Sequence, residues 1–148
     1  MKRILFLSAL FIFACSSDDS SDNSNGTFLD TYNGVVWKEA GSTQADFEWW
    51  HIYTNETFVY CERFEPDCDC GTLNWGETLE GGRSYVISEN TSDRLVIIST
   101  EFDEQETGLE QVVITISATN DGNNLELVYS DDPNFIEYYE RVNEQPCE

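Results

Sequence analysis

The stretch QVVITISATNDGNNLELVYS, residues 111–130, predicts two neighbouring β-strands joined by a tight turn. Its apolar side chains recur at every second position, at Val112, Ile114, Ile116 and again at Leu125, Leu127 and Tyr129. Because successive side chains of a strand point to opposite faces, this alternation indicates strands with one buried face. Residues 120–123, Asn-Asp-Gly-Asn, tolerate positive φ and therefore favour a hairpin turn.

The same pattern continues outward from this hairpin. FEWWHIYT (47–54) alternates in the same way, whereas RLVIIST (94–100) is a continuous apolar run, as expected for a strand covered on both faces. At most, residues 27–32 form one short helical turn. Turn-forming residues separate the runs and predict eight or nine strands, at about residues 34–39, 46–54, 57–64, 72–75, 84–89, 94–102, 110–118, 124–130 and 135–142.

Short sequential strands of this kind favour an all-β domain built as an antiparallel meander. Closure of the meander into a small barrel removes exposed strand edges that would otherwise pair with other chains. A β-sandwich made from the same strands is the alternative. We expect this domain to span residues 27–148.

The N-terminal residues have the layout of a secretory signal over residues 1–14. Lys2 and Arg3 precede an almost wholly apolar segment, residues 4–13, which is too short to span a bilayer. The following Ile12-Phe13-Ala14-Cys15 resembles the lipobox of bacterial lipoproteins. The resemblance implies that Cys15 becomes the new N-terminus and carries acyl chains, palmitate among them, that anchor the protein in a membrane.

Residues 15–26 predict a disordered acidic tether, because Ser, Asp, Asn and Gly after the cysteine provide nothing apolar to bury. The Ser16-Ser17-Asp18-Asp19 start resembles the signal that sends some lipoproteins to the outer face of the outer membrane, which implies a bacterial cell-surface location. A spacer without a sorting role, and an anchor facing the periplasm, are the alternatives.

The chain is strongly acidic, with 29 Asp and Glu against seven Lys and Arg and a formal charge of −22. Without Lys2 and Arg3 the charge becomes −24. Such a balance argues against nucleic-acid binding, which needs a basic footprint. Aromatic residues make up 14% of the chain, so an ordered core is expected despite the charge.

Four cysteines remain besides Cys15, namely Cys61, Cys68, Cys70 and Cys147. In an exported protein they predict disulfides. A Cys68–Cys70 bond would close a strained loop, so we expect Cys61 to pair with one of these two and Cys147 with the other. The spacing does not fit a zinc site, and no metal or cofactor is predicted.

A family resemblance lies at the two ends of the predicted domain. Gly34-Val35-Val36-Trp37 opens the first strand and Arg141 lies in the last, similar to the lipocalin-like domains of small bacterial surface lipoproteins, although lipocalins have Gly-x-Trp where this chain has Gly-x-x-Trp. The resemblance implies that Arg141 packs over Trp37 to close the barrel base. It also implies that a small apolar or amphipathic ligand binds in the barrel mouth.

Five aromatic residues are the predicted ligand-binding side chains: Trp49, Trp50, Tyr53, Tyr60 and Trp75. Filling of the core by the same rings is the simpler interpretation. Trp49 and Trp50 are adjacent, so we expect one inside the domain and one outside. In the alternative function, a packed domain binds a protein or carbohydrate through exposed rings such as Trp50 or Trp75.

No catalytic residues are predicted. His51 is the only histidine and lies in a predicted strand, without a recognisable nucleophile motif. The acidic residues are too numerous to single out a catalytic pair, and the segment 65–69 lacks the ligand spacing of an EF-hand. We therefore expect a non-enzymatic protein.

Overall fold

The computed structural model describes residues 26–41, 47–64, 67–102 and 108–147. The predicted signal segment, Cys15 and nearly all of the predicted tether lie outside these residues. The elements are α1 (Phe28–Tyr32), β1 (Val36–Glu39), β2 (Phe47–Tyr53), β3 (Thr57–Phe64), β4 (Asp67–Asn74), the 3₁₀ turn η1 (Glu80–Gly82), β5 (Ser84–Asn90), β6 (Arg94–Phe102), β7 (Leu109–Thr119), the 3₁₀ turn η2 (Asn120–Gly122), β8 (Asn124–Tyr129) and β9 (Ile136–Val142). No helix in these ranges is long and apolar enough to cross a membrane.

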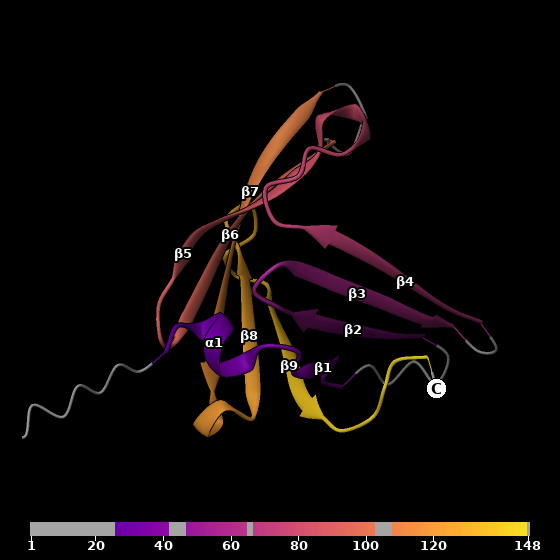
Figure 1. Ribbon diagram of the computed structural model, residues 1–148, viewed down its shortest axis with the longest axis vertical. Coiled ribbons are helices and arrows are strands. Elements are labelled where there is room, and N and C mark those ends of the chain that lie inside the picture. Colours follow the sequence, from indigo (N-terminus) through magenta and orange to yellow (C-terminus); the bar gives the residue numbers. More distant parts are fainter. Residues whose placement is uncertain (1–25, 42–46, 65–66, 103–107, 148) are drawn as a thin grey trace, which may run out of the picture.

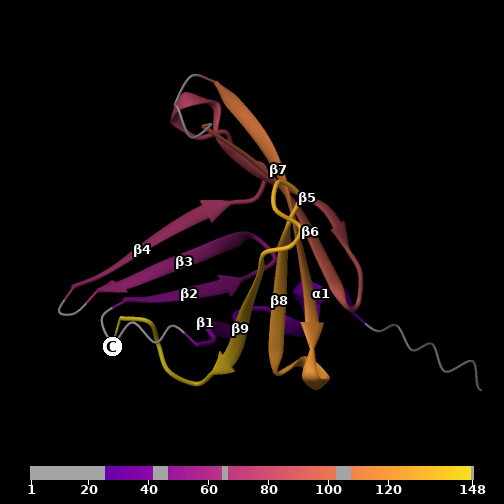
Figure 2. The same cartoon turned by 180° about the vertical axis from the view of Figure 1, so that it is seen from behind.

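The nine strands form one antiparallel sheet in the order β4-β3-β2-β1-β9-β8-β7-β6-β5. Strands that follow each other in the sequence therefore pair with each other, except that β4 does not pair with β5. The first strand, β1, pairs with the last, β9. The sheet is strongly curled into a half-barrel, in which β2–β4 run across the direction of β6–β8 (Figures 1 and 2). The prediction of an all-β antiparallel meander is confirmed, and its two edges are β4 and β5.

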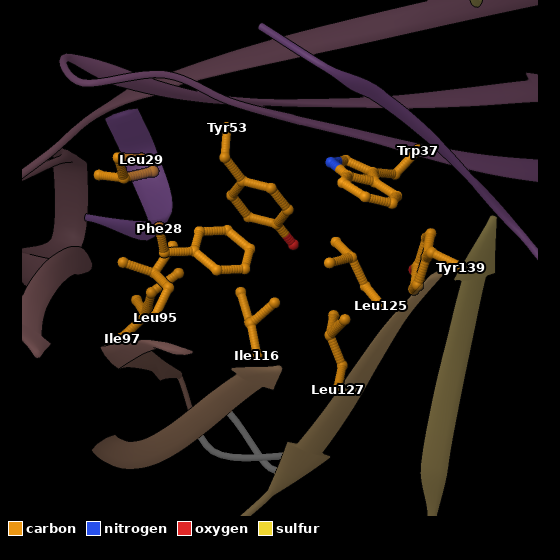
Figure 3. Close-up of a cluster of buried hydrophobic side chains, with 10 residues drawn as sticks. All are labelled: Phe28, Leu29, Trp37, Tyr53, Leu95, Ile97, Ile116, Leu125, Leu127 and Tyr139. Atoms are coloured by element: carbon orange, nitrogen blue, oxygen red, sulfur yellow. The ribbon is translucent and has the colours of Figure 1, made fainter. Parts of the chain in front are cut away.

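The main core lies on the concave side of the curled sheet. Figure 3 shows Trp37 and Tyr53 extending toward Leu125, Leu127 and Ile116 from the other half of the sheet, with Phe28 beside Tyr53. These side chains are at most 2% exposed. Burying an aliphatic or aromatic side chain contributes roughly 1.5–3 kcal/mol, so this cluster is the main source of the domain's stability.

The short helix α1 closes one end of the half-barrel. Thr27 caps the helix, since its side chain accepts a hydrogen bond from the Asp30 amide while the Asp30 carboxylate accepts from the Thr27 amide. Phe28 is completely buried in the main core, and the backbone amides of Phe28 and Leu29 donate to Thr91 and Asn90 at the β5–β6 turn. The expected single turn at residues 27–32 is therefore present, and it packs against the β5–β6 turn at one end of the half-barrel.

Strand β4 begins five residues earlier than the predicted strand at 72–75, at Asp67. Its first four residues, Asp-Cys-Asp-Cys, look like a polar loop in the sequence. In the structure they pair with β3, and Cys61 lies directly opposite Cys70. The Cys61–Cys70 disulfide joins these two strands, and the Cys68–Cys147 disulfide ties the C-terminal segment to β4. This is one of the two arrangements that the sequence left open.

Candidate functional site

The concave face carries a set of aromatic side chains that leave two adjoining hollows. We call the first the carboxylate hollow; it has a volume of about 210 Å³ and is lined by Glu39, Trp49, His51, Tyr129, Glu137 and Tyr139. We call the second the apolar hollow; it has a volume of about 190 Å³ and is lined by His51, Tyr53, Phe58, Tyr85, Ile97, Glu101, Ile114, Ile116, Leu127 and Tyr129. His51 and Tyr129 line both hollows, so the two form one candidate site.

The pairing register explains why these residues meet. Strand β1 lies between β2 and β9, with Trp37 opposite both His51 and Arg141, and Glu39 opposite Tyr139. Directly opposed residues in an antiparallel pair point to the same face. Side chains two positions apart on a strand share a face, so Glu39 points to the same side as the buried Trp37, and Glu137 to the same side as Tyr139.

Tyrosine hydroxyls hold the carboxylates in place. Tyr129 donates a hydrogen bond of 2.8 Å to Oε2 of Glu137, and Tyr139 donates one of 3.3 Å to the same atom. In the apolar hollow, Tyr85 and Ser99 donate to Oε1 of Glu101. Hydrogen bonds to an ionised acceptor are stronger than neutral ones, so these contacts fix the positions of two half-buried negative charges.

Burial shifts the pKa values of the groups in the site. It raises the pKa of Glu39, and the neighbouring charge of Glu137 adds to the shift. Burial also raises the pKa values of Tyr53, Tyr129 and Tyr139, with a further contribution from Glu137 in each case. The tyrosines therefore stay protonated at neutral pH and remain hydrogen-bond donors.

His51 belongs to this aromatic set. Its ring stacks on Tyr139 with centroids 4.5 Å apart, and its Nδ1 lies 3.1 Å from the Tyr53 hydroxyl. Burial lowers the pKa of His51 to about 3, so the ring is neutral at physiological pH. The geometry places tyrosine hydroxyls at both ring nitrogens, the second contact being Nε2 to Tyr139 at 3.5 Å.

Of the five predicted ligand-binding residues, two line the hollows, two pack beside them, and Trp50 lies in a separate cluster. Trp49 lines the carboxylate hollow and Tyr53 lines the apolar hollow. Tyr60 and Trp75 pack on Phe58 beside the apolar hollow but line neither of the two hollows.

The prediction that Trp50 binds a ligand is corrected by its position in the structure. It points away from the concave face, as the alternation with Trp49 requires, but it is only 1% exposed. It packs in a second cluster with Val36 and Cys61, and the Lys38 ammonium lies 4.9 Å from its ring centroid. Trp50 is therefore a structural residue, and the alternative in which it binds a partner as an exposed ring is wrong.

Trp75 is also not free to act as an exposed ring. Its indole N–H donates a hydrogen bond of 2.9 Å to the Thr54 carbonyl, and its ring stacks on Phe58 with centroids 6.2 Å apart. These contacts hold Trp75 against the main core. Its role is to support the wall of the apolar hollow from behind.

Trp37 and Arg141 are direct cross-strand partners. Trp37 is completely buried, whereas Arg141 is exposed and lines a separate hollow of about 250 Å³ together with residues 33–36, 142, 143 and 145. Among the residues that the structure describes, no aromatic side chain lines this larger hollow. For that reason we favour the concave site, and the closing role of Arg141 stays a prediction.

The described residues include one group with metal-ligand geometry, formed by Cys61, Cys70 and Cys147. All three sulfurs are in disulfides, so they offer no thiolate to a metal ion. The group is a structural staple.

Several residues of the site escaped the sequence reasoning: Glu39, Tyr85, Glu101, Tyr129, Glu137 and Tyr139. A signal for the carboxylates was present, because Glu39 follows Trp37 by two residues and Glu101 follows Ile97 by four. Each acid thus continues the phase of a buried residue on its own strand. What the sequence lacks is the register that pairs β1 with β9, and the curl of the sheet that places β6 across the apolar hollow from β2.

The fold and the site define a class: a curled, single-sheet antiparallel β protein with an aromatic and acidic concave face. Comparison with protein-family models, with curated proteins and with solved structures gives no match for this chain. The resemblance to lipocalins therefore stays a prediction based on the residues and the strand order.

Proposed function

We propose that the chain is a non-enzymatic, lipocalin-like binding protein that holds a small apolar or amphipathic ligand on its concave face. The observation that carries the proposal is the pair of adjoining hollows, walled by aromatic and aliphatic side chains from both halves of the sheet. Ligand sites are typically concave and mostly apolar, with a few polar groups that fix orientation. Each hollow is below the usual range of roughly 300–1,000 Å³, which favours a small ligand.

The hydrogen-bonding state of the polar groups supports a binding role. A catalytic histidine needs a nucleophile or proton donor within reach and a pKa near the working pH. His51 instead contacts two tyrosine hydroxyls, and burial lowers its pKa to about 3. Such a ring serves as a neutral wall of the pocket.

Two adjacent residues of β7 provide a matched test of ligand binding. Ile114 lines the apolar hollow, whereas Val113 is 38% exposed on the opposite face. Ile114→Trp fills the hollow and is expected to weaken binding of the neutral fluorescent probe N-phenyl-1-naphthylamine at least tenfold. Val113→Trp adds the same ring outside and should leave binding unchanged. Equal affinities in wild type and both folded variants would contradict the proposal.

We further propose that acyl chains on Cys15 anchor the protein at the bacterial outer membrane, facing the cell surface. The support is the sequence alone: a basic head, an apolar segment, Ala14 and then Cys15, followed by an acidic start. One acyl chain gives only marginal binding, so several chains are needed for stable attachment.

The anchor is tested by cell fractionation. Cys15→Ser should move the protein from the membrane pellet to the soluble fraction, while Ser16→Ala should stay in the pellet. Protease added to intact cells then reports surface exposure. A Cys15→Ser protein that still sediments with membranes to the wild-type extent would refute the anchor.

A further inference from the structure

The carboxylate hollow concentrates negative charge against aromatic walls. Glu39 from β1 and Glu137 from β9 both line it, together with the rings of Trp49, Tyr129 and Tyr139. The two tyrosine hydroxyls hold Oε2 of Glu137 at 2.8 and 3.3 Å. The hollow thus has one carboxylate held in a fixed position, a second carboxylate on its lining, and aromatic rings around them.

The described residues that line this hollow include no lysine or arginine to balance the acids. His51 does not balance them, because its ring is neutral at physiological pH. The ionisable groups beside the hollow on the adjoining segments include Tyr53 of β2, Asp131 after β8 and, across the shared wall, Tyr85 and Glu101. They are neutral or negative as well.

The charge of Glu137 already makes ionisation of Glu39 harder. A positive group placed between the two carboxylates would relieve this repulsion. It would also gain cation–π attraction from the surrounding rings, since aromatic cages are a recurrent way to bind alkylammonium groups. A neutral ligand would relieve nothing, and an anion would add to the repulsion.

We infer that the ligand of this site is a free organic amine or quaternary ammonium compound, with its cationic head in the carboxylate hollow and its apolar body in the apolar hollow. This inference rests on the proposed binding function and narrows it to one ligand class. A phosphate-bearing lipid headgroup is a poorer occupant, because the phosphate would enter the field of the same carboxylates.

A pair of isosteric probes isolates the charge. Choline and 3,3-dimethylbutan-1-ol have nearly the same shape, and only choline carries a positive nitrogen. The full chain is reconstituted in phosphatidylglycerol nanodiscs, whose lipid has no ammonium group, and binding is titrated by saturation-transfer NMR against empty nanodiscs. We expect choline to bind at least about tenfold more tightly than the alcohol, and phosphocholine to bind more weakly than choline.

Glutamine variants test which carboxylates provide the preference. Glu137→Gln and Glu39→Gln should each reduce the choline preference severalfold, and either variant suffices if the other does not fold. Glu140→Gln is the matched control, because Glu140 is exposed on the same strand, β9, and points to the opposite face. It should keep the full preference.

The acid titration provides a separate readout. Choline does not titrate. Burial and the charge of Glu137 raise the pKa of Glu39, and the other ionisable groups around the two hollows are Glu101, Glu137, His51 and the tyrosines. Choline affinity should fall as the pH drops and Glu39 loses its charge. The fall should be smaller in Glu39→Gln.

The outcomes separate this inference from the proposed function. If N-phenyl-1-naphthylamine binds but choline shows no preference over the alcohol, the amine inference is wrong and the binding function stands. If phosphocholine binds more tightly than choline, the assignment to a free amine is wrong. If neither the neutral probe nor choline binds, both proposals fail.

Discussion

Removal of the Cys68–Cys147 disulfide should destabilise the protein more than removal of the Cys61–Cys70 disulfide. The first bond joins residues 79 positions apart and the second joins residues nine apart. A disulfide limits the conformational freedom of the unfolded chain, and the effect grows with the logarithm of the loop length. The perturbations are two double variants, Cys68→Ala with Cys147→Ala and Cys61→Ala with Cys70→Ala.

The loop lengths set the expected magnitudes. The chain-entropy relation gives about 4.5 kcal/mol for the long loop and about 2.6 kcal/mol for the short one at 25 °C. Cys61 is 1% exposed and packs beside Trp50, so its truncation adds a packing loss of roughly 1 kcal/mol to the short-loop variant. The long-loop variant should still be the less stable of the two.

Urea unfolding followed by tryptophan fluorescence measures both variants against the wild type. Because the two loops overlap in sequence, the effects are compared between variants and not summed. The slope of the unfolding free energy with urea should rise most when the long loop is opened, since the unfolded chain then exposes more surface. If the Cys61–Cys70 variant proves equally or more destabilised, loop entropy does not govern these bonds and the reasoning is wrong.

Three further predictions concern the core and the site. Burial lowers the pKa of His51 to about 3, so its contribution to the unfolding free energy is complete above pH 6.5 and is lost as the pH falls toward 3. In urea titrations at pH 7, 6 and 5, the unfolding free energy of the wild type should fall by up to about 1.4 kcal/mol per pH unit relative to His51→Phe. Parallel pH profiles of the two proteins would contradict this prediction. A Cβ at Gly71 would lie 2.2 Å from the Tyr60 ring, so Gly71→Ala should cost about 1–3 kcal/mol in unfolding experiments, and the cost should shrink in a Tyr60→Ala background. Phe28→Ala should lower the unfolding free energy by about 3–5 kcal/mol in thermal unfolding, because Phe28 is fully buried. Phe135→Ala is the control: Phe135 is 56% exposed, so this change should alter the stability by less than about 0.5 kcal/mol. Similar losses in the two variants would refute the packing role of α1.

The strand pattern was largely predictable because the alternation in β7 and β8 reflects burial of one face. The N-terminal part of β4 was not, since Asp67 and Asp69 resemble a loop and enter the sheet through pairing with β3. The choice of disulfide partners was equally hidden. The sulfurs of Cys70 and Cys147 lie 3.4 Å apart without being bonded to each other, and it is the register that places Cys70 opposite Cys61 and Cys68 opposite Arg63.

The site was predictable only in part. The aromatic content of β2 indicated that Trp49 or Trp50 points inward, but only the sheet geometry shows that it is Trp49. Glu39 and Glu137 are 98 positions apart in the sequence and meet because β1 pairs with β9. Register between distant strands depends on the whole sheet, so local patterns do not reveal such a pair.

The pairing of β1 with β9 makes the domain suitable for circular permutation. The gap in the sheet falls between β4 and β5, at the connection formed by residues 75–83, rather than between the two ends of the domain. A circular permutant that begins at β5 and joins β9 to α1 through a linker would have its strands in the same order along the chain and across the sheet. Every ladder would then be local, the mean sequence separation of contacts would fall, and such a permutant should fold faster than the natural connectivity.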